Sequence, residues 1–266
     1  MHRTLFTPAM IETFNSCRKA YQVAFEKFSN GPTQATASVI CKKFMLRTLA
    51  EINRSRLCTV NQVQKYMGQH WPVEKLEEQV TEKDKTTRAF LFAYKSLIKY
   101  VGKPYCPADS YVVSVALKVR ARIAHVRVYV EDTMDLVLWY PEEKRLEIVD
   151  FQLHPLKPVD PSWPSPALLV KYFLAEKLKT RWPFEKLTIT QYRVGLQDYQ
   201  PLCLNLEESL FRVHWDELVK TIDEMKAGTT EPSPCALDEK GACSHCQTLS
   251  SQVHESEEPL LFRLSA

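Results

Sequence analysis

The sequence predicts an α/β protein with a mainly helical part over residues 1–103, a sheet core over residues 104–228 and a cysteine-rich segment over residues 229–247. Two observations support this prediction. Before Pro104 the apolar residues recur at helical spacing, and after it short segments rich in β-branched and aromatic residues follow one another. With 266 residues, of which 45% are apolar, the chain can bury a sizeable core. We therefore expect one domain, followed by a polar tail over residues 248–266.

The helices are indicated by periodicity and by end signals. Thr7 and Pro8 are typical of an N-cap and a first helical position, and Gly228 is typical of a helix end. Thr59 is expected to start a further short helix. The expected helices cover residues 8–25, 36–54, 59–70, 74–101, 166–180 and 206–225.

The strands are indicated by runs of β-branched and aromatic residues. An antiparallel run of four strands is expected over Tyr111–Leu117, Ile123–Val130, Met134–Tyr140 and Arg145–Phe151. A fifth strand is expected over residues 186–195.

Composition excludes several classes of function. Six glycines in the whole chain leave no glycine-rich phosphate loop, which argues against P-loop, kinase and dinucleotide-binding folds. The 35 basic and 32 acidic residues give a net charge of +3, too balanced to indicate a nucleic-acid or membrane partner by bulk charge. The chain shows neither a secretory signal nor a bilayer-spanning run, so we expect a cytoplasmic protein that does not associate with membranes.

Two aspartates are predicted to face each other across a hairpin. If residues 141–144 form a four-residue loop, Tyr140 pairs with Arg145, and by the same count Asp135 pairs with Asp150. Side chains in such a pair lie about 5 Å apart on one face, where like charges repel. Gln152 lies two residues further along that face.

Two interpretations of this pair remain open. Opposed carboxylates at the end of a buried hairpin suit a Mg²⁺ site, because Mg²⁺ is held by one or two carboxylates together with water and phosphate. The alternative is that Asp135 and Asp150 lie at strand ends in solvent.

Three of the eight cysteines cluster near the C-terminus. Cys243 and Cys246 have a C-x-x-C spacing that is typical of zinc or iron–sulfur ligands, and Cys235 precedes them. Cys17, midway along the first helix, is a candidate fourth ligand, and it could equally be a small apolar residue on a helix face. His245 and His254 are local alternatives that would favour Zn²⁺.

These motifs, in this order, resemble the PD-(D/E)XK nuclease superfamily, in particular its RecB-like and AddB-like branch with a C-terminal iron–sulfur cluster. The similar segments are Phe14–Tyr21, Thr133–Val137, Glu147–Gln152 and Cys243–Cys246. The resemblance implies a restriction-endonuclease-like fold over residues 1–247, with a central mixed sheet flanked by helices. It also implies that Cys17, Cys243 and Cys246 are ligands of a 4Fe–4S cluster, with Zn²⁺ as the alternative metal. The family's further cysteine, six residues after Cys246, is Gln252 here, and we take the upstream Cys235 as the fourth ligand.

The chain departs from the family pattern at several polar positions. Gln152 stands where the family has lysine, and we consider Lys171 and Lys157 as substitutes. Tyr172 is similar to the tyrosine of the family's Gln-x-x-x-Tyr motif, but Leu168 stands at the glutamine position. The segment corresponding to the family's metal-binding histidine, residues 37–41, contains no histidine.

The resemblance implies hydrolysis of DNA phosphodiesters, single-stranded or duplex, with Asp135 and Asp150 holding Mg²⁺ or Mn²⁺. Such nucleases often work with a helicase or another DNA-processing protein. Because the lysine and histidine are missing, a non-catalytic descendant that serves as a DNA-binding or partner-docking module is the second hypothesis. A purely structural protein without metal at the two aspartates is the third. The local basic clusters Lys118/Arg120/Arg122 and Lys42/Lys43/Arg47 are candidate phosphate contacts.

Overall fold

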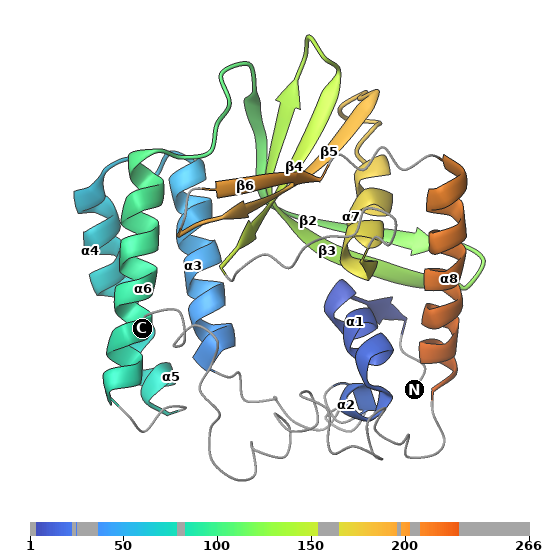
Figure 1. Cartoon of the computed structure of the whole chain (residues 1–266), viewed down its shortest axis with the longest axis horizontal. Coiled ribbons are helices and arrows are strands. Elements are labelled where there is room, and N and C mark those ends of the chain that lie inside the picture. Colours follow the sequence, from blue (N-terminus) through green and yellow to red (C-terminus); the bar gives the residue numbers. More distant parts are fainter. Residues whose placement is uncertain are drawn as a thin grey trace.

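The structure is a computed structural model that describes residues 4–22, 25, 37–78, 83–153, 165–195, 198–202 and 208–228. Its helices are α1 (Pro8–Ser16), α2 (Arg18–Tyr21), α3 (Ala37–Asn53), α4 (Val60–His70), α5 (Val73–Glu77), α6 (Lys83–Gly102), α7 (Pro166–Glu176) and α8 (Glu208–Ala227). Its strands are β1 (Leu5–Phe6), β2 (Tyr111–Ile123), β3 (Val128–Tyr140), β4 (Arg145–Gln152), β5 (Lys186–Arg193) and β6 (Asp198–Leu202). The protein is thus a mixed α/β structure with a mixed sheet flanked by helices (Figure 1).

Most of the expected helices are present, but two of them are interrupted. The first expected helix is divided at Cys17, whose backbone is extended with a φ of −161°, into α1 and the short α2. The long helix expected over residues 74–101 is represented by α5 and α6 as separate helices. Thr59 does cap α4, because its hydroxyl accepts a hydrogen bond from the Gln62 backbone while the Gln62 side chain accepts one from the Thr59 backbone.

The expected run of four antiparallel strands is wrong, because it contains three strands with a different turn. The polar residues 131–133, which look like a turn, lie inside β3, where Glu131 binds Lys118 and Arg120 of β2. The actual turn between β2 and β3 comprises residues 124–127, which include no glycine, proline or asparagine. Arg127 adopts the left-handed conformation there, with a φ of 55°.

One edge of β3 is shared by two strands that leave a gap between them. β2 pairs with the opposite edge of β3 along nearly its whole length. On the shared edge, β4 pairs with residues 136–140 of β3, and β1 pairs in parallel with Tyr129 and Val130. Within the described ranges, no strand pairs with residues 131–135 on this edge. The sheet continues through β5, parallel to β4, to β6, and α7 connects β4 to β5.

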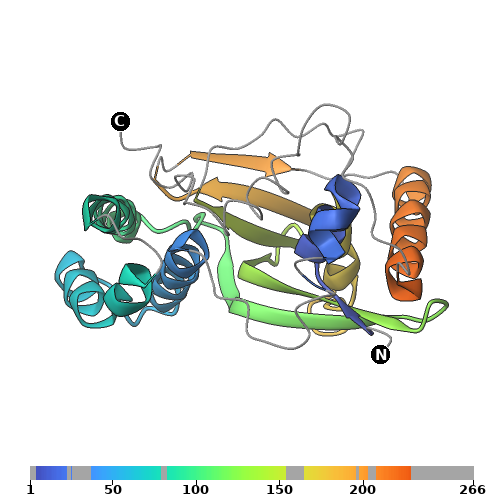
Figure 2. The same cartoon turned by 90° about the horizontal axis from the view of Figure 1, so that it is seen from below.

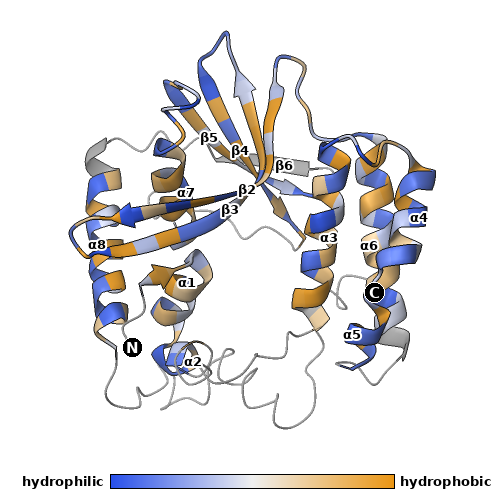
Figure 3. Ribbon diagram, turned by 180° about the vertical axis from the view of Figure 1, so that it is seen from behind, coloured by the Kyte–Doolittle hydropathy of each residue, from blue (hydrophilic) through white to orange (hydrophobic). Residues whose placement is uncertain are grey.

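The sheet is buried on both faces, as the apolar pattern of the hairpin predicts. We call the two cores the α7 core, formed with α1, α7 and α8, and the α6 core, formed with α3, α4 and α6. Val137 and Ile148 contribute to the α7 core, whereas Leu138 and Val149 contribute to the α6 core. Figures 1 and 2 show the two groups of helices on opposite sides of the sheet. The helices that cover the sheet are amphipathic, and Figure 3 shows hydrophilic and hydrophobic segments alternating along α8.

The alternation of side chains along β3 changes phase at Asp135. Met134 contributes to the α7 core, but Leu136, two residues later, contributes to the α6 core, and Val137 belongs to the α7 core again. The residue opposite Asp135 is Ala116, which has a φ of 51°, in the left-handed region that favours glycine. As a result of this irregularity in β2 and β3, two side chains of β3 that are three residues apart, such as Met134 and Val137, lie on the same side of the sheet.

None of the helices in the described ranges combines the length and apolarity needed to span a bilayer.

Candidate functional site

Asp135 and Asp150 lie one position beyond the paired part of the β3–β4 hairpin, whose register is the one that the hairpin count predicts. Tyr140 pairs with Arg145, and the pairing of β3 with β4 continues to Leu136 and Val149. There the two strands separate, and the next two residues in register are Asp135 and Asp150. The backbone N–H of Phe151 donates a hydrogen bond to Asp135 Oδ2 at 2.9 Å, so a side-chain oxygen takes the place of a strand carbonyl as its acceptor. The two carboxylates therefore lie where the hairpin opens.

Gln152 holds one oxygen of Asp150. Its Nε2 donates a hydrogen bond to Asp150 Oδ2 at 2.6 Å, which confirms that the two side chains share a face of β4. In this arrangement Gln152 orients the carboxylate and carries no charge of its own.

Lys171 of α7 reaches the same carboxylates from the helical layer. α7 begins at Pro166 with Ser165 as its N-cap, and it packs its apolar residues into the α7 core. Lys171 is the charged residue within this buried stretch, and its side chain is 7% exposed. Its Nζ lies 3.3 Å from Asp150 Oδ1 and 2.5 Å from Asp132 Oδ2. The structure thus brings Asp150 and Lys171 together.

Tyr172, the next residue, packs its ring against Phe211 of α8, with ring centroids 4.7 Å apart. Consecutive helical residues point about 100° apart, so a helix that directs Lys171 at the carboxylates directs Tyr172 elsewhere. Lys157 lies outside the described residues.

Asp132 is a residue that the sequence pattern did not indicate. In a regular strand Asp132 and Asp135 would point to opposite faces, because side chains alternate. The change of phase at Asp135 brings both toward α7, where Asp132 Oδ2 binds Lys171. Its other oxygen, Oδ1, accepts a hydrogen bond from the backbone N–H of Thr133 at 2.8 Å.

Glu12 of α1 is a second residue that sequence reasoning missed. Although Glu12 is exposed overall, burial of its carboxyl is the main cause that raises its pKa. The negative charges of Asp150 and Asp132 raise it further, while the Ala167 backbone N–H and Lys171 oppose the shift. These influences place Glu12 beside the start of α7 and within electrostatic reach of the carboxylates.

The carboxylates and the lysine perturb one another strongly. Burial, followed by the charge of Asp150, raises the pKa of Asp135 to about 7, against the opposing effects of the Phe151 N–H, Lys171 and Lys42. Burial alone would lower the pKa of Lys171, but Asp150, Asp132 and Asp135 outweigh it and raise this pKa. Lys171 is therefore a permanent cation among acidic groups. Such perturbed, mutually coupled groups are typical of functional sites.

We predict that the metal-free protein loses stability as pH rises from about 4 to about 7. Asp135 has an ordinary pKa of 3.8 when unfolded and about 7 when folded, so over this range the folded state binds the extra proton. Asp135→Asn should remove this contribution, because an asparagine oxygen still accepts the Phe151 N–H but does not titrate. Urea unfolding at pH 5 and pH 8 in chelator measures both proteins. An equal change of stability with pH in the two proteins would contradict the assignment.

The donor set suits a hard divalent cation held by few protein ligands. Among the described residues, no three Asp, Glu, His or Cys side chains form a group ready to hold a metal ion. Two carboxylates are nevertheless the usual protein contribution to a Mg²⁺ site, with water and phosphate completing the shell. Both oxygens of Asp150 already have partners, Lys171 and Gln152, so metal binding requires at least one of these side chains to adjust. With that adjustment, Asp135 and Asp150 fit Mg²⁺ or Mn²⁺.

Cys17 lies at a boundary between helices, close to the end of α8. It is 2% exposed, and its Sγ accepts a hydrogen bond from the Ala20 N–H at 3.5 Å. Cys17 lines a cavity of about 280 Å³ together with Thr221 and Glu224 of α8, and Arg18 binds Glu224 at 2.8 Å. The other proposed cluster residues, Cys235, Cys243 and Cys246, and the alternatives His245 and His254, lie outside the described residues.

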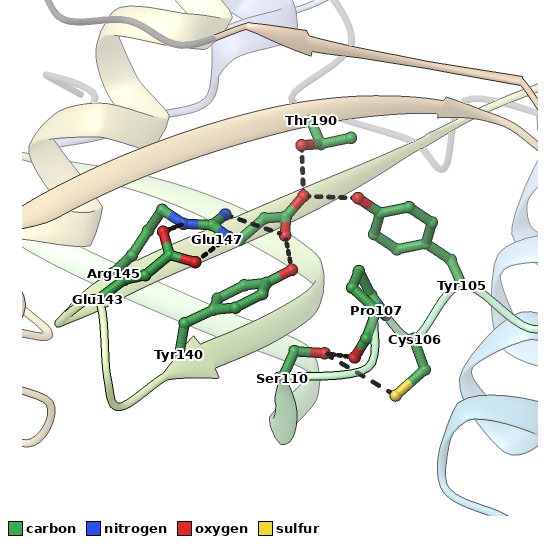
Figure 4. Close-up of polar contacts among 9 residues, drawn as sticks. All are labelled: Tyr105, Cys106, Pro107, Ser110, Tyr140, Glu143, Arg145, Glu147 and Thr190. Atoms are coloured by element: carbon green, nitrogen blue, oxygen red, sulfur yellow. Dashed lines mark hydrogen bonds and ion pairs between the residues drawn. The ribbon is translucent and has the colours of Figure 1, made fainter.

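A second polar cluster lies on the other face of the hairpin (Figure 4). Glu147 of β4 is buried, and its carboxylate accepts hydrogen bonds from Tyr105, Tyr140 and Thr190. Arg145 lies 3.5 Å from the same carboxylate and 3.6 Å from the centroid of the Tyr140 ring. Burial and then the Glu147 carboxylate raise the pKa of Tyr105, so its hydroxyl remains a donor. The members of this cluster bind one another within the protein. They link β3, β4 and β5 to the segment before β2.

No protein-family model matches the chain, and no curated protein matches it significantly.

Proposed function

We propose that the protein is a metal-dependent phosphodiesterase acting on DNA, with a restriction-endonuclease-like fold and a PD-(D/E)XK-type site. The observation that carries this proposal is the position of Lys171 Nζ, 3.3 Å from Asp150 in the opened end of the hairpin. Phosphodiester cleavage by this type of site needs two carboxylates and a nearby cation. The chain supplies the carboxylates from the hairpin and the cation from a helix.

Each residue has a role in this proposal. Asp135 and Asp150 would hold Mg²⁺ or Mn²⁺, and the bound ion would supply an activated water and stabilisation of negative charge on the phosphate. Lys171 adds a fixed positive charge beside the attacked phosphate, as the missing strand lysine would. Gln152 keeps Asp150 oriented. Hydrolysis forms a bond between the water oxygen and phosphorus and breaks the bond to the leaving oxygen, which takes up a proton.

The basic residues of α3 support DNA as the substrate. Lys42, Lys43 and Arg47 are exposed on α3, and the charge of Lys42 reaches Asp135. Phosphate contacts of this kind are independent of base sequence and weaken with salt. In contrast, two members of the other basic cluster, Lys118 and Arg120, are already bound by Glu131.

The direct test is cleavage of end-labelled single-stranded and duplex DNA by the purified protein with Mn²⁺ or Mg²⁺. We expect cleavage that chelator abolishes. A wild-type protein that binds DNA in Mn²⁺ and leaves both substrates intact would overturn the catalytic proposal.

A non-catalytic DNA-binding or partner-docking module is the second candidate, and one observation favours it. Lys171 and Gln152 together engage both oxygens of Asp150, so this carboxylate has partners within the protein without an added ion. Calorimetry distinguishes the two candidates: the nuclease binds Mn²⁺ at this site, and the non-catalytic module does not.

We further propose that Cys17, Cys235, Cys243 and Cys246 bind a 4Fe–4S cluster. The support is the position of Cys17 beside the last turns of α8, from which the chain continues toward Cys235. The eight residues that follow Ala227, up to and including Cys235, span at most about 29 Å when extended, which allows the chain to return to Cys17. Such a cluster would join the first helices to the end of the domain.

For this cluster we predict about four iron atoms per chain after anaerobic purification, with broad absorbance near 400 nm. Cys17→Ser should abolish iron retention, because one thiolate ligand is lost. Cys41→Ala is the matched control, because Cys41 is also buried but packs in a different apolar cluster, with Leu76 and Ala89. Zinc without iron in the wild-type protein would support the alternative metal, and iron retained in Cys17→Ser would exclude Cys17.

A further inference from the structure

Asp132 is the closest partner of the site lysine. Lys171 Nζ lies 2.5 Å from Asp132 Oδ2 and 3.3 Å from Asp150 Oδ1, so the ammonium group leans toward Asp132. The side chain of Asp132 is 19% exposed, and its Oδ1 is fixed by the Thr133 N–H. Asp132 is thus a rigid acceptor for Lys171, positioned by its own backbone.

Asp132 acts against the attraction of the Lys171 ammonium group to the other carboxylates of the site. Asp150, Asp132 and Asp135 all attract the ammonium group, and Glu12 of α1 also lies within reach of its charge. A lysine released from Asp132 is therefore drawn by charge toward Asp150, 3.3 Å away, which is one of the carboxylates proposed to hold the divalent cation. Lys171 and a divalent cation compete for the same Asp150 oxygens, since both are positive.

We propose that Asp132 is a positioning residue, which holds the Lys171 ammonium aside so that Asp150 can bind a divalent cation while the lysine stays in the site. This inference rests on the proposed function and assigns a role to a residue outside its set of metal ligands. Asp132 acts through Lys171 and touches neither substrate nor metal. Without Asp132, Lys171 collapses onto Asp150 and weakens metal binding.

The first experiment is a double-mutant cycle on Mn²⁺ affinity, measured by calorimetry on the full chain. Asp132→Asn should raise the Mn²⁺ dissociation constant about tenfold or more. In a Lys171→Met background the same change should have little effect, because the competing ammonium group is gone. An equal loss of affinity in both backgrounds would mean that Asp132 contacts the metal directly, and would overturn the proposal.

Glu131→Gln is the matched control for this cycle. It removes the same charge one residue away in β3, but Glu131 binds Lys118 and Arg120 on the opposite face. Its Mn²⁺ affinity should equal that of the wild-type protein. A loss similar to that of Asp132→Asn would show that only the overall charge of β3 matters.

The second experiment needs no metal and uses the ¹H–¹⁵N signal of the Lys171 ammonium group. A buried, doubly bound ammonium group should exchange slowly with water and give a visible signal, which Lys171→Arg identifies by its loss. Asp132→Asn should abolish or strongly shift this signal, and Glu131→Gln should leave it unchanged. An unaltered signal in Asp132→Asn would overturn the positioning role. If the wild-type protein binds no Mn²⁺, the proposed function fails, and this signal still decides whether Asp132 holds Lys171.

Discussion

Asp150→Asn is expected to reduce Mn²⁺-dependent DNA cleavage by at least about 10³-fold, because it removes a negative metal ligand that a neutral amide replaces poorly. The substitution keeps the size of the side chain, and the amide oxygen can still accept from Gln152. The fold should therefore survive. Initial cleavage rates at saturating Mn²⁺ measure the loss, and thermal unfolding confirms that the variant is folded.

The matched control lies in the same hairpin. Glu143→Gln removes an acidic charge from the turn, where the exposed carboxylate binds only Arg145 among the described residues. Its cleavage rate should equal that of the wild-type protein. Cleavage that survives in Asp150→Asn would show that the activity comes from elsewhere in the chain or from a contaminant.

Glu147→Ala is expected to lower the free energy of unfolding by about 3 kcal/mol or more, since removing one member of a buried charged network leaves the others unsatisfied. Tyr105, Tyr140 and Thr190 would all lose the acceptor of their hydroxyl groups. Arg145 would lose its buried carboxylate partner and keep the exposed Glu143 and the Tyr140 ring. Urea unfolding at neutral pH measures the effect.

Tyr105→Phe provides the graded comparison, because it deletes one donor and keeps the carboxylate. Its expected cost is about 1 kcal/mol, the usual net value of one hydrogen bond. If Glu147→Ala cost no more than Tyr105→Phe, the cluster would not act as a network. Neither change should alter Mn²⁺ affinity, because Glu147 faces the α6 core and the aspartates face the α7 core.

The hairpin and its register were accessible from the sequence because the information is local. A polar four-residue turn lies between two apolar strands, and the pairing count then places Asp135 beside Asp150. The same holds for α4, where the capping box of Thr59 and Gln62 marks the start of the helix within four residues. Where adjacent residues carry the signal, the prediction needs no tertiary information.

The rest of the site depends on contacts between distant segments. Lys171 could be placed on a helix after β4, but its approach to Asp132 depends on how α7 packs against the sheet. Glu12 lies more than one hundred residues from Asp135 and Asp150, and nothing around it in the sequence marks it. Asp132 lies between two of the expected strands, residues 123–130 and 134–140, and its actual position inside β3 brings it to a partner on α7.

Two short strands were missed for a related reason. β1 has two residues, too few for any periodicity, and it pairs with β3 more than one hundred residues away. β6 contains Asp198 and Pro201, residue types that are depleted in strands. Their pairing with β3 and β5 is a tertiary event.

The change of phase in β3 makes one strand part of both cores. Val128, Val130 and Met134 are buried in the α7 core, whereas Leu136 and Leu138 are buried in the α6 core. Neither core can therefore lose its packing without disturbing the strand that carries Asp132 and Asp135.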